Sequence, residues 1–328
     1  MKNNLFSYAT SELSQDAFIC WLASYALEGA KTDNALQECA KEMITMFVPE
    51  LCGQEYTLTE VERQKYHVDV LLTVQVSGGC YKIIVEDKTY TTEHDNQLKN
   101  YLDVIKKNNT DCVIRGVYYK TGFQCDLSTV EDAGYTIITR MQMLHLMGKY
   151  VSFTRNQIFL DYFEYWDNFQ QETEGYRDLP VSRWGWRQIN GFYDHLKITN
   201  YLSKRNFWMG YGYVANRKGG FHGLWTGINN HRICVNGDFY ELYLQMETFI
   251  GGPTSAQLCL KLSVVDSDED KEKIRTARDH LIYTEQWTYN LEKYNFRKPA
   301  RLAVGRHMTL GIYTLTYMTM MLFWMRWI

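Results

Sequence analysis

The stretch Tyr66-His-Val-Asp-Val-Leu-Leu-Thr-Val-Gln-Val-Ser-Gly-Gly-Cys-Tyr-Lys-Ile-Ile-Val-Glu-Asp-Lys88 decides the fold of this 328-residue chain. It contains two runs rich in Val, Ile, Leu and Tyr, residues 66–76 and 81–88, on either side of a Gly78-Gly79 pair. Apolar runs of this length around a glycine turn predict a β-hairpin.

The charged residues of this hairpin indicate a metal-dependent phosphodiesterase. Side chains alternate between the faces of a strand, so Glu86 and Lys88 share one face. Asp87 points to the other face and is not expected to be a ligand. Antiparallel pairing would bring Asp69 beside Glu86. Charges at the end of so apolar a strand are costly unless they are paired or bind a metal.

The expected chemistry follows from these residue types. Carboxylate oxygens of Asp69 and Glu86 suit Mg²⁺ or Mn²⁺, and such an ion would polarise a phosphate and lower the pKa of a bound water. Lys88 would orient or deprotonate that water and stabilise the developing charge. Gln97 and Tyr101 are four residues apart, so they would share the helix face that looks over the site.

The tripeptide Glu-Asp-Lys is weak by itself, because it occurs twice. The second copy, Glu269-Asp270-Lys271, lies in the charge run 266–273, which is typical of a solvated segment leading into a helix. The first copy differs in its apolar strand, its upstream Asp69 and the Gln-x-x-x-Tyr helix that follows. A salt bridge on an edge strand remains the alternative interpretation.

The order Asp69, Glu86-x-Lys88 and Gln97-x-x-x-Tyr101 resembles the PD-(D/E)xK nuclease superfamily, in particular its RecB-like branch. The opening segment, residues 5–22, is similar to the first helix of an uncharacterised bacterial family of that superfamily. The resemblance covers about residues 5–145. Val68 replaces the proline that precedes the aspartate in the family motif, at a position that varies widely.

The resemblance implies a restriction-endonuclease-like αβββαβ core with a mixed central sheet. It also implies Mg²⁺ or Mn²⁺ at Asp69 and Glu86, a catalytic Lys88, and Glu12 from the first helix near the metal. The implied function is hydrolysis of DNA phosphodiester bonds by a Mg²⁺-dependent deoxyribonuclease in bacterial defence or repair. The alternative is a non-catalytic nucleic-acid-binding or scaffold protein that keeps the nuclease fold.

The rest of the chain predicts an α/β (α+β) protein of two units, a nuclease-like domain at 1–175 and a β-rich, aromatic domain of unknown role at 176–328. Helices are expected at 12–28, 33–47, 140–148, 155–171 and 268–283, and further strands at 56–63, 111–119, 135–139 and 309–317. Thr91 or Thr92 would cap the helix that carries Gln97. Asn236-Gly237 predicts a second hairpin turn within 232–249.

Two interpretations fit the aromatic residues of the second unit. Trp184, Trp186, Trp208 and Trp225 could stack bases of single-stranded nucleic acid or form the core of a β-rich domain. His222, His231, His280 and Cys234 have no metal-ligand spacing, so they predict no zinc site.

Bulk composition limits the setting. No signal peptide is visible and eight scattered cysteines indicate reduced thiols, so a cytoplasmic protein is expected. A net charge of −3 requires a local basic face for DNA, to which Lys99, Lys106, Lys107, Arg115 and Lys120 could contribute.

The apolar end of the chain, residues 310–328, approaches the length of a membrane span. Its repeated Thr, two Tyr and Arg326 make a spanning helix the minority interpretation, so no membrane is expected. Alternating Thr and apolar residues at 309–317 favour a strand instead. The end could pack into the fold or mediate association with a second copy or a partner protein. A frame error in the coding sequence would also produce such a tail.

Overall fold

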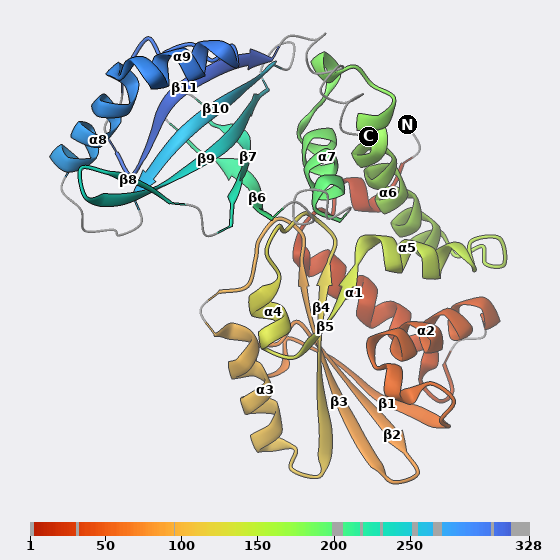
Figure 1. Ribbon diagram of the computed structural model, residues 1–328. Coiled ribbons are helices and arrows are strands. Elements are labelled where there is room, and N and C mark those ends of the chain that lie inside the picture. The colour runs from red at the N-terminus through yellow and green to blue at the C-terminus, as the bar shows by residue number, and fades with distance from the viewer. Residues whose placement is uncertain are drawn as a thin grey trace. The chain divides into compact units, whose positions relative to one another are not determined.

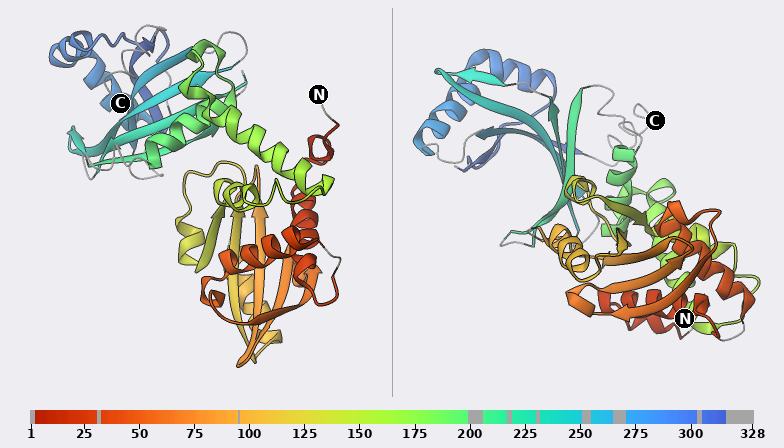
Figure 2. Two further views of the ribbon diagram at one scale, coloured as in Figure 1. Left: turned by 90° about the vertical axis from the view of Figure 1, so that its right-hand side faces the viewer. Right: turned by 90° about the horizontal axis from the view of Figure 1, so that it is seen from below.

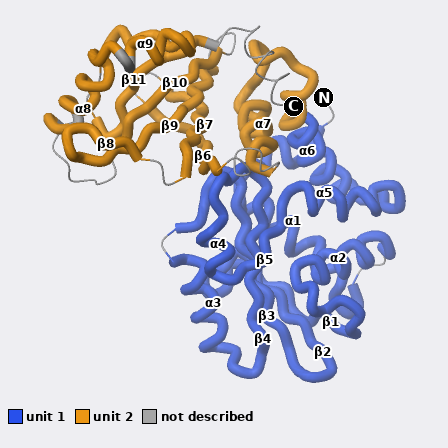
Figure 3. Tube along the Cα trace, in the orientation of Figure 1, with its two compact units in different colours: residues 1–171 blue, residues 172–328 orange. Residues whose placement is uncertain are grey.

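The computed structural model describes residues 3–30, 33–94, 96–198, 206–216, 219–229, 232–250, 255–264, 271–302 and 305–315 (Figure 1). The chain divides into two compact units, residues 1–171 and 172–328 (Figure 3). Both units contain helices as well as strands, so the expected mixed α/β class is confirmed.

The first unit is built on a mixed five-stranded sheet in the order β1-β2-β3-β4-β5. Its strands are β1 (Tyr56–Arg63), β2 (Val70–Val76), β3 (Gly79–Lys88), β4 (Cys112–Lys120) and β5 (Tyr135–Thr139). The pairs β1–β2 and β2–β3 are antiparallel, whereas β3–β4 and β4–β5 are parallel. The carboxyl ends of β3 and β4 therefore lie at the same edge of the sheet.

The hairpin of β2 and β3 turns one residue earlier than the sequence suggested. Val76 pairs with Gly79, so Ser77 and Gly78 form the turn. The expected Gly78-Gly79 turn is wrong because Gly79 already belongs to the ladder of β3.

Helices cover both faces of this sheet (Figures 1 and 2). One face carries α3 (Gln97–Asn108) and α4 (Ser128–Asp132). The other carries α1 (Glu12–Ala23) and α2 (Asn34–Phe47), with α5 (Arg140–Gly148) and α6 (Gln157–Glu174) following in the chain. Short 3₁₀ turns are found at Leu5–Ser7, Ser24–Ala26, Pro49–Leu51, Lys65–His67, Gly175–Arg177 and Val181–Arg183.

Apolar spacing explains how α3 is held in place. Leu98 and Ile105 are seven residues apart, so they lie on one face of the helix. Both are buried against Ile84 of β3 and Tyr118 of β4. Burial of such side chains stabilises the layer by about 1.5–3 kcal/mol each. This packing places the first turn of α3 at the carboxyl end of β3.

Cys80 and Cys112 form a disulfide between the paired strands β3 and β4. The prediction that all eight cysteines are reduced thiols is therefore wrong for this pair. The two residues face each other in the parallel register, with Cα atoms 4.7 Å apart, although they are 32 residues apart in sequence. Sequence spacing could not reveal a pairing that only the sheet creates.

The second unit contains a sheet in the order β11-β10-β9-β7-β6, with β8 paired to β9. Its strands are β6 (Phe207–Val214), β7 (Phe221–Ile228), β8 (Ile233–Val235), β9 (Asp238–Phe249), β10 (Ser255–Val264) and β11 (His307–Leu315). Its helices are α7 (Trp186–Ile198), α8 (Lys271–Tyr283) and α9 (Glu285–Lys293). Asn236 and Gly237 have φ angles of 53° and 91°, so the predicted hairpin turn is confirmed.

One face of this second sheet packs against α8. Leu262 of β10 and Met308 of β11 are buried with Ala277 and Leu281 of the helix. Residues 265–270, which hold most of the charge run, and residues 316–328 of the apolar end lie outside the described residues. No helix among the described residues is long and apolar enough to cross a membrane.

Glycines accommodate two of the tryptophans on the second sheet. A Cβ atom on Gly210 would lie 2.1 Å from the Trp225 ring, and one on Gly227 would lie 2.8 Å from Trp208. Both rings are half-buried. Trp184 is buried beside Tyr176 and Phe192, as the core interpretation expects.

Candidate active site

The acidic residues of the first unit gather where β3 ends and β2 begins. Val70 pairs with Val85, and continuing that register places Asp69 opposite Glu86. Gln64, Tyr66 and His67, in the turn before Asp69, have φ angles of 56°, 54° and 68°. Non-glycine residues seldom adopt this left-handed conformation, and such strain is concentrated at functional sites.

The α3 side of the site joins four of the predicted residues. Glu86 Oε1 accepts hydrogen bonds from Lys88 Nζ at 2.5 Å and from Gln97 Nε2 at 2.9 Å. Gln97 Nε2 also donates to Tyr101 Oη at 2.8 Å. Glu86 is fully buried and Lys88 is 8% exposed. The strand ending and the first turn of α3 thus present two acid–base groups and two polar side chains at one place.

The α1 side holds a second set of carboxylates. One oxygen from each of Asp16, Asp69 and Asp87 lies within 4.8 Å of the other two. Gln64 Nε2 donates to Asp16 Oδ2 at 3.2 Å and to Asp69 Oδ1 at 3.3 Å. The backbone N–H of Asp87 donates to Asp69 Oδ2 at 3.3 Å. The Asp69 carboxyl group therefore reaches residues on both faces of β3, Glu86 on one and Asp87 on the other.

The opposite orientation of Asp87 was predicted correctly from strand alternation. Its exclusion as a ligand does not follow, however, because Asp69 reaches the α1 side as well. Sequence reasoning missed Asp16 for a related reason. Its signal was an acid directly before the apolar helix segment Ala17-Phe18-Ile19, but helix register could not be fixed from sequence.

Glu12, the expected first-helix ligand, lies beside the loop that follows β3. Its Oε1 accepts from the backbone N–H of Thr89 at 3.0 Å and from Thr91 Oγ1 at 2.6 Å. Burial raises the pKa of Glu12, but these hydrogen bonds and the nearby Lys88 and Lys120 lower it below the usual value overall. Asp16, one turn later, is the carboxylate of α1 that approaches Asp69.

The start of α3 differs from the expected cap. Asn96, with φ 56°, occupies the N-cap position, and its side chain does not cap the helix. The prediction of a Thr91 or Thr92 cap is wrong. Thr91 binds Glu12 through its hydroxyl and accepts from Lys120 Nζ through its carbonyl at 2.6 Å. These contacts hold the loop between β3 and α3.

Burial and mutual repulsion shift the acidic groups strongly. Burial first, and then the neighbouring Asp69 carboxylate, raise the pKa of Glu86 to about 8. Burial also raises the pKa of Asp69, and burial together with Asp16 raises the pKa of Asp87 well above its usual value. Burial alone would lower the pKa of Lys88, but the Glu86 and Asp69 carboxylates outweigh it and raise that pKa.

The residues at this site fit a divalent cation. Asp16 Oδ1, Glu86 Oε2 and both side-chain oxygens of Asp87 are buried and meet no hydrogen-bond donor among the described residues. Their close polar neighbours include other carboxyl groups, Asp16 beside Asp87 and Asp69 beside Glu86. Unpaired buried carboxylate oxygens are costly, and they are also the preferred ligands of Mg²⁺ and Mn²⁺. A cation here would satisfy them.

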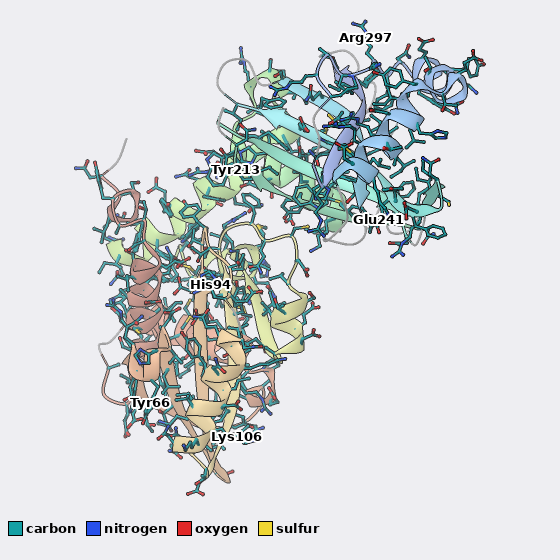
Figure 4. The ribbon with its side chains drawn as sticks, turned by 90° about the vertical axis from the view of Figure 1, so that its left-hand side faces the viewer. Tyr66, His94, Lys106, Tyr213, Glu241 and Arg297 are labelled. Atoms are coloured by element: carbon teal, nitrogen blue, oxygen red, sulfur yellow. A yellow bond between two sulfur atoms is a disulfide. The ribbon has the colours of Figure 1, made fainter. Side chains whose placement is uncertain are left out.

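A polar hollow of about 400 Å³ borders Gln97. It is lined by Glu93, His94, Asn96, Gln97, Leu98, Lys99, Thr129, Asp132 and Ala133. His94, before the first turn of α3, and Lys106, in its last turn, mark the two ends of that helix (Figure 4). The hollow thus opens at the end of α3 that carries Gln97.

The five expected basic residues do not form one exposed face. Lys120 is buried and bonded to Thr91, and Arg115 Nε pairs with Glu50 Oε1 at 2.7 Å. Burial lowers the pKa of Lys120 to about 8. Lys99, Lys106 and Lys107 are exposed on α3.

The histidines and cysteine of the second unit are distributed over separate elements. His222 lies on β7, Cys234 on β8 and His280 on α8, and His231 lies outside the described residues. Within the described ranges these residues form no group of potential metal ligands.

Comparisons with known proteins found no match from which a function could be assigned. No protein-family model matches the chain, and neither a curated protein nor a solved structure matches it. The functional argument therefore depends on the geometry of the carboxylates, Lys88, Gln97 and Tyr101.

Proposed function

We propose that the chain is a metal-dependent nuclease of the PD-(D/E)xK superfamily that hydrolyses phosphodiester bonds of DNA. One observation carries the proposal. The buried Glu86 carboxylate binds Lys88 and Gln97 through one oxygen, and its other oxygen meets no hydrogen-bond donor among the described residues. Glu86 lies against the Asp69 carboxyl group, so only a proton or a cation can join the two acids.

The order of elements supports a restriction-endonuclease-like core. The chain runs α1, β1, β2, β3, α3 and β4, with the α2 helix inserted after α1. This is the αβββαβ order, and α3 is the crossover between the parallel strands β3 and β4. In open sheets with parallel strands, ligands bind outside the carboxyl ends of the strands, where Glu86 and Lys88 lie.

In the proposed mechanism, Asp69 and Glu86 hold Mg²⁺ or Mn²⁺. The ion supplies Lewis acidity toward a phosphate oxygen and a bound water of lowered pKa. Lys88 keeps its proton at neutral pH, because Glu86 and Asp69 raise its pKa. It therefore acts by orienting the attacking water and by stabilising negative charge on the phosphate. Gln97 holds Glu86, and Tyr101 holds Gln97.

The substrate assignment rests on the resemblance to DNA nucleases. The exposed Lys99, Lys106 and Lys107 on α3 support it, since lysines on one helix can neutralise phosphates. A cytoplasmic role in bacterial defence or repair is part of the same proposal. The proposal also includes association through the second unit, either with a second copy of the chain or with a partner protein.

The decisive test is Mg²⁺- or Mn²⁺-dependent cleavage by the purified full chain. Plasmid DNA, linear duplex DNA, single-stranded DNA and RNA are compared for the wild type and for Asp69→Asn, Glu86→Gln and Lys88→Ala. Each substitution should lower the cleavage rate by about 10²–10³-fold, the loss typical of removing one transition-state interaction. EDTA should abolish wild-type cleavage.

Asp103→Asn on the exposed surface of α3 is the matched control and should cleave like the wild type. Equal cleavage by all five proteins would refute the active-site assignment. A non-catalytic binding or scaffold protein predicts a different result, in which DNA is bound without cleavage and Mn²⁺ binds equally to wild type and Glu86→Gln. Calorimetry with Mn²⁺ separates these two functions.

A further inference from the structure

Asp87 is a buried carboxylate that the proposed nuclease mechanism does not use. Its side chain is 1% exposed, and its oxygens meet no hydrogen-bond donor among the described residues. They contact the Asp16 carboxyl group, to which a hydrogen bond forms only when one of the two acids is protonated. The charged side chains that act on it most strongly are Asp16, Asp69 and Glu12, all of them acidic. A buried group of acids must be neutralised, either by protons or by a bound cation.

The neighbours of Asp87 are placed like ligands of one ion. The nearest oxygens of Asp16, Asp69 and Asp87 are all within 4.8 Å of one another. Metal–oxygen distances of about 2.0–2.6 Å put ligands on opposite sides of a hard cation about 4–5 Å apart, so three such oxygens fit one coordination shell. Asp16 is 1% exposed and its Oδ1 is also unpaired among the described residues.

Protein groups around the cluster orient its carboxylates without neutralising them. The Gln64 amide bridges Asp16 and Asp69, and the backbone N–H of Asp87 holds the second oxygen of Asp69. Arg63 Nε lies 3.9 Å from Asp16 Oδ2, but the Arg63 side chain is 43% exposed and the pair is screened by solvent. The buried Asp16 and Asp87 and the half-buried Asp69 thus have two positively charged neighbours, the exposed Arg63 beside Asp16 and Lys88, which acts on Asp69.

We propose that Asp16, Asp69 and Asp87 hold a divalent cation on the α1 side of β3, separate from the ion assigned to Asp69 and Glu86. The ligands are oxygen atoms alone, so the ion is a hard cation such as Mg²⁺, Mn²⁺ or Ca²⁺. Asp69 contributes to both positions. This cation site follows from the burial of Asp16 and Asp87 and from the spacing of the three aspartates, and it does not require that the chain cleaves DNA.

The experiment counts Mn²⁺ ions bound to the full chain by calorimetry and by electron paramagnetic resonance of free Mn²⁺. The wild type should bind two ions, and Asp87→Asn and Asp16→Asn should each bind one. Loss of even an outer-shell partner weakens metal affinity by about 10–100-fold, so loss of a direct ligand should weaken the affected site at least that much. Glu86→Gln should keep the ion of the α1 side and weaken the other.

Asp103→Asn provides the matched control and should bind two ions. Circular dichroism and thermal unfolding in EDTA test folding, and Asp16→Asn serves as the second variant should Asp87→Asn fold poorly. Wild-type stoichiometry and affinity in both Asp87→Asn and Asp16→Asn would overturn the proposal, as would a single ion lost equally from these variants and from Glu86→Gln.

The results for the cation and for the nuclease are distinguishable. Two ions without cleavage of any nucleic acid would support the α1-side site and contradict the proposed function. Cleavage by a chain that binds one ion, unaffected by Asp87→Asn, would support the function and overturn the site.

Discussion

Glu86→Gln should make the metal-free chain more stable than the wild type by a margin that grows with pH. The reason is the buried position of Glu86, which raises its pKa from the usual 4.5 to about 8 in the folded chain. Between these two values the folded chain binds a proton that the unfolded chain has lost. Wild-type stability therefore falls as pH rises through this interval. Glutamine does not titrate, so the variant does not lose stability at this position as pH rises.

The magnitude follows from the size of the pKa shift. Each pH unit in the interval corresponds to about 1.4 kcal/mol, so the difference between variant and wild type has an upper limit of about 5 kcal/mol at pH 8. Near pH 4.5 the Glu86 carboxyl is protonated in the folded chain, and glutamine is a close mimic of it. The difference should then be small. Asp87, whose pKa is also raised, contributes alike to both proteins, because Glu86 is not among the groups that shift it. Asp69 interacts directly with Glu86, so part of the measured difference belongs to this pair.

Hydrogen exchange of the β2 and β3 amides in EDTA is the appropriate assay. It reports opening of the first unit by itself, whereas unfolding of the whole chain would mix two units. Wild type, Glu86→Gln and the exposed control Asp103→Asn are compared at matched pH values from 5 to about 8, so that the intrinsic pH dependence of exchange cancels.

A pH-independent difference between Glu86→Gln and wild type would refute the argument that burial keeps Glu86 protonated. A difference that shrinks as pH rises would show that ionised Glu86 stabilises the fold through Lys88. Adding Mn²⁺ should remove most of the pH dependence of the wild type, because a bound cation favours the ionised carboxylates.

Two further predictions concern single positions. A Cβ atom on Gly122 would lie 1.9 Å from the carbonyl oxygen of Thr89, so Gly122→Ala must displace the end of β3. It should destabilise the first unit by about 1–3 kcal/mol and reduce cleavage. Gly78→Ala, whose Cβ atom meets nothing within 4 Å, should do neither, and equal protection of the β3 amides from hydrogen exchange in the two variants would contradict this. In the second unit, Glu247 accepts from Gln245 and Gln257 and pairs with Lys261 at 3.1 Å. Glu247→Ala should lower the free energy of unfolding of the second unit by about 3–5 kcal/mol relative to the exposed control Glu292→Ala. The reason is that Lys261 then remains buried without its counter-ion.

The sequence by itself determined the local parts of the site. Strand alternation fixed the opposite orientations of Glu86 and Asp87, and helical spacing placed Gln97 and Tyr101 on one face of α3. The hairpin turns at residues 77–79 and at Asn236-Gly237 could be located to within one residue, because glycine and asparagine adopt the required backbone angles. These features depend on residues close together in the chain.

Several elements had weaker local signals. The strand β10 and the helices α7 and α9 were not predicted, because their apolar residues are interrupted by polar ones that the tertiary fold buries. Lys261 and Ser263 of β10 and Asn190 of α7 are such buried polar residues, and Lys261 is paired with Glu247 of the neighbouring strand. Sequence periodicity cannot distinguish a polar side chain paired in the interior from one in solvent.

Only the tertiary structure decided which distant groups meet. It brought Asp16 rather than Glu12 to Asp69, returned Asp87 to the carboxylate cluster, and joined Cys80 to Cys112 across two strands. It also buried Lys120, which the sequence had assigned to a basic surface. The physical reason is that such contacts depend on the register between elements, which the packing of whole layers sets. The same packing buries Glu86 and thereby raises its pKa.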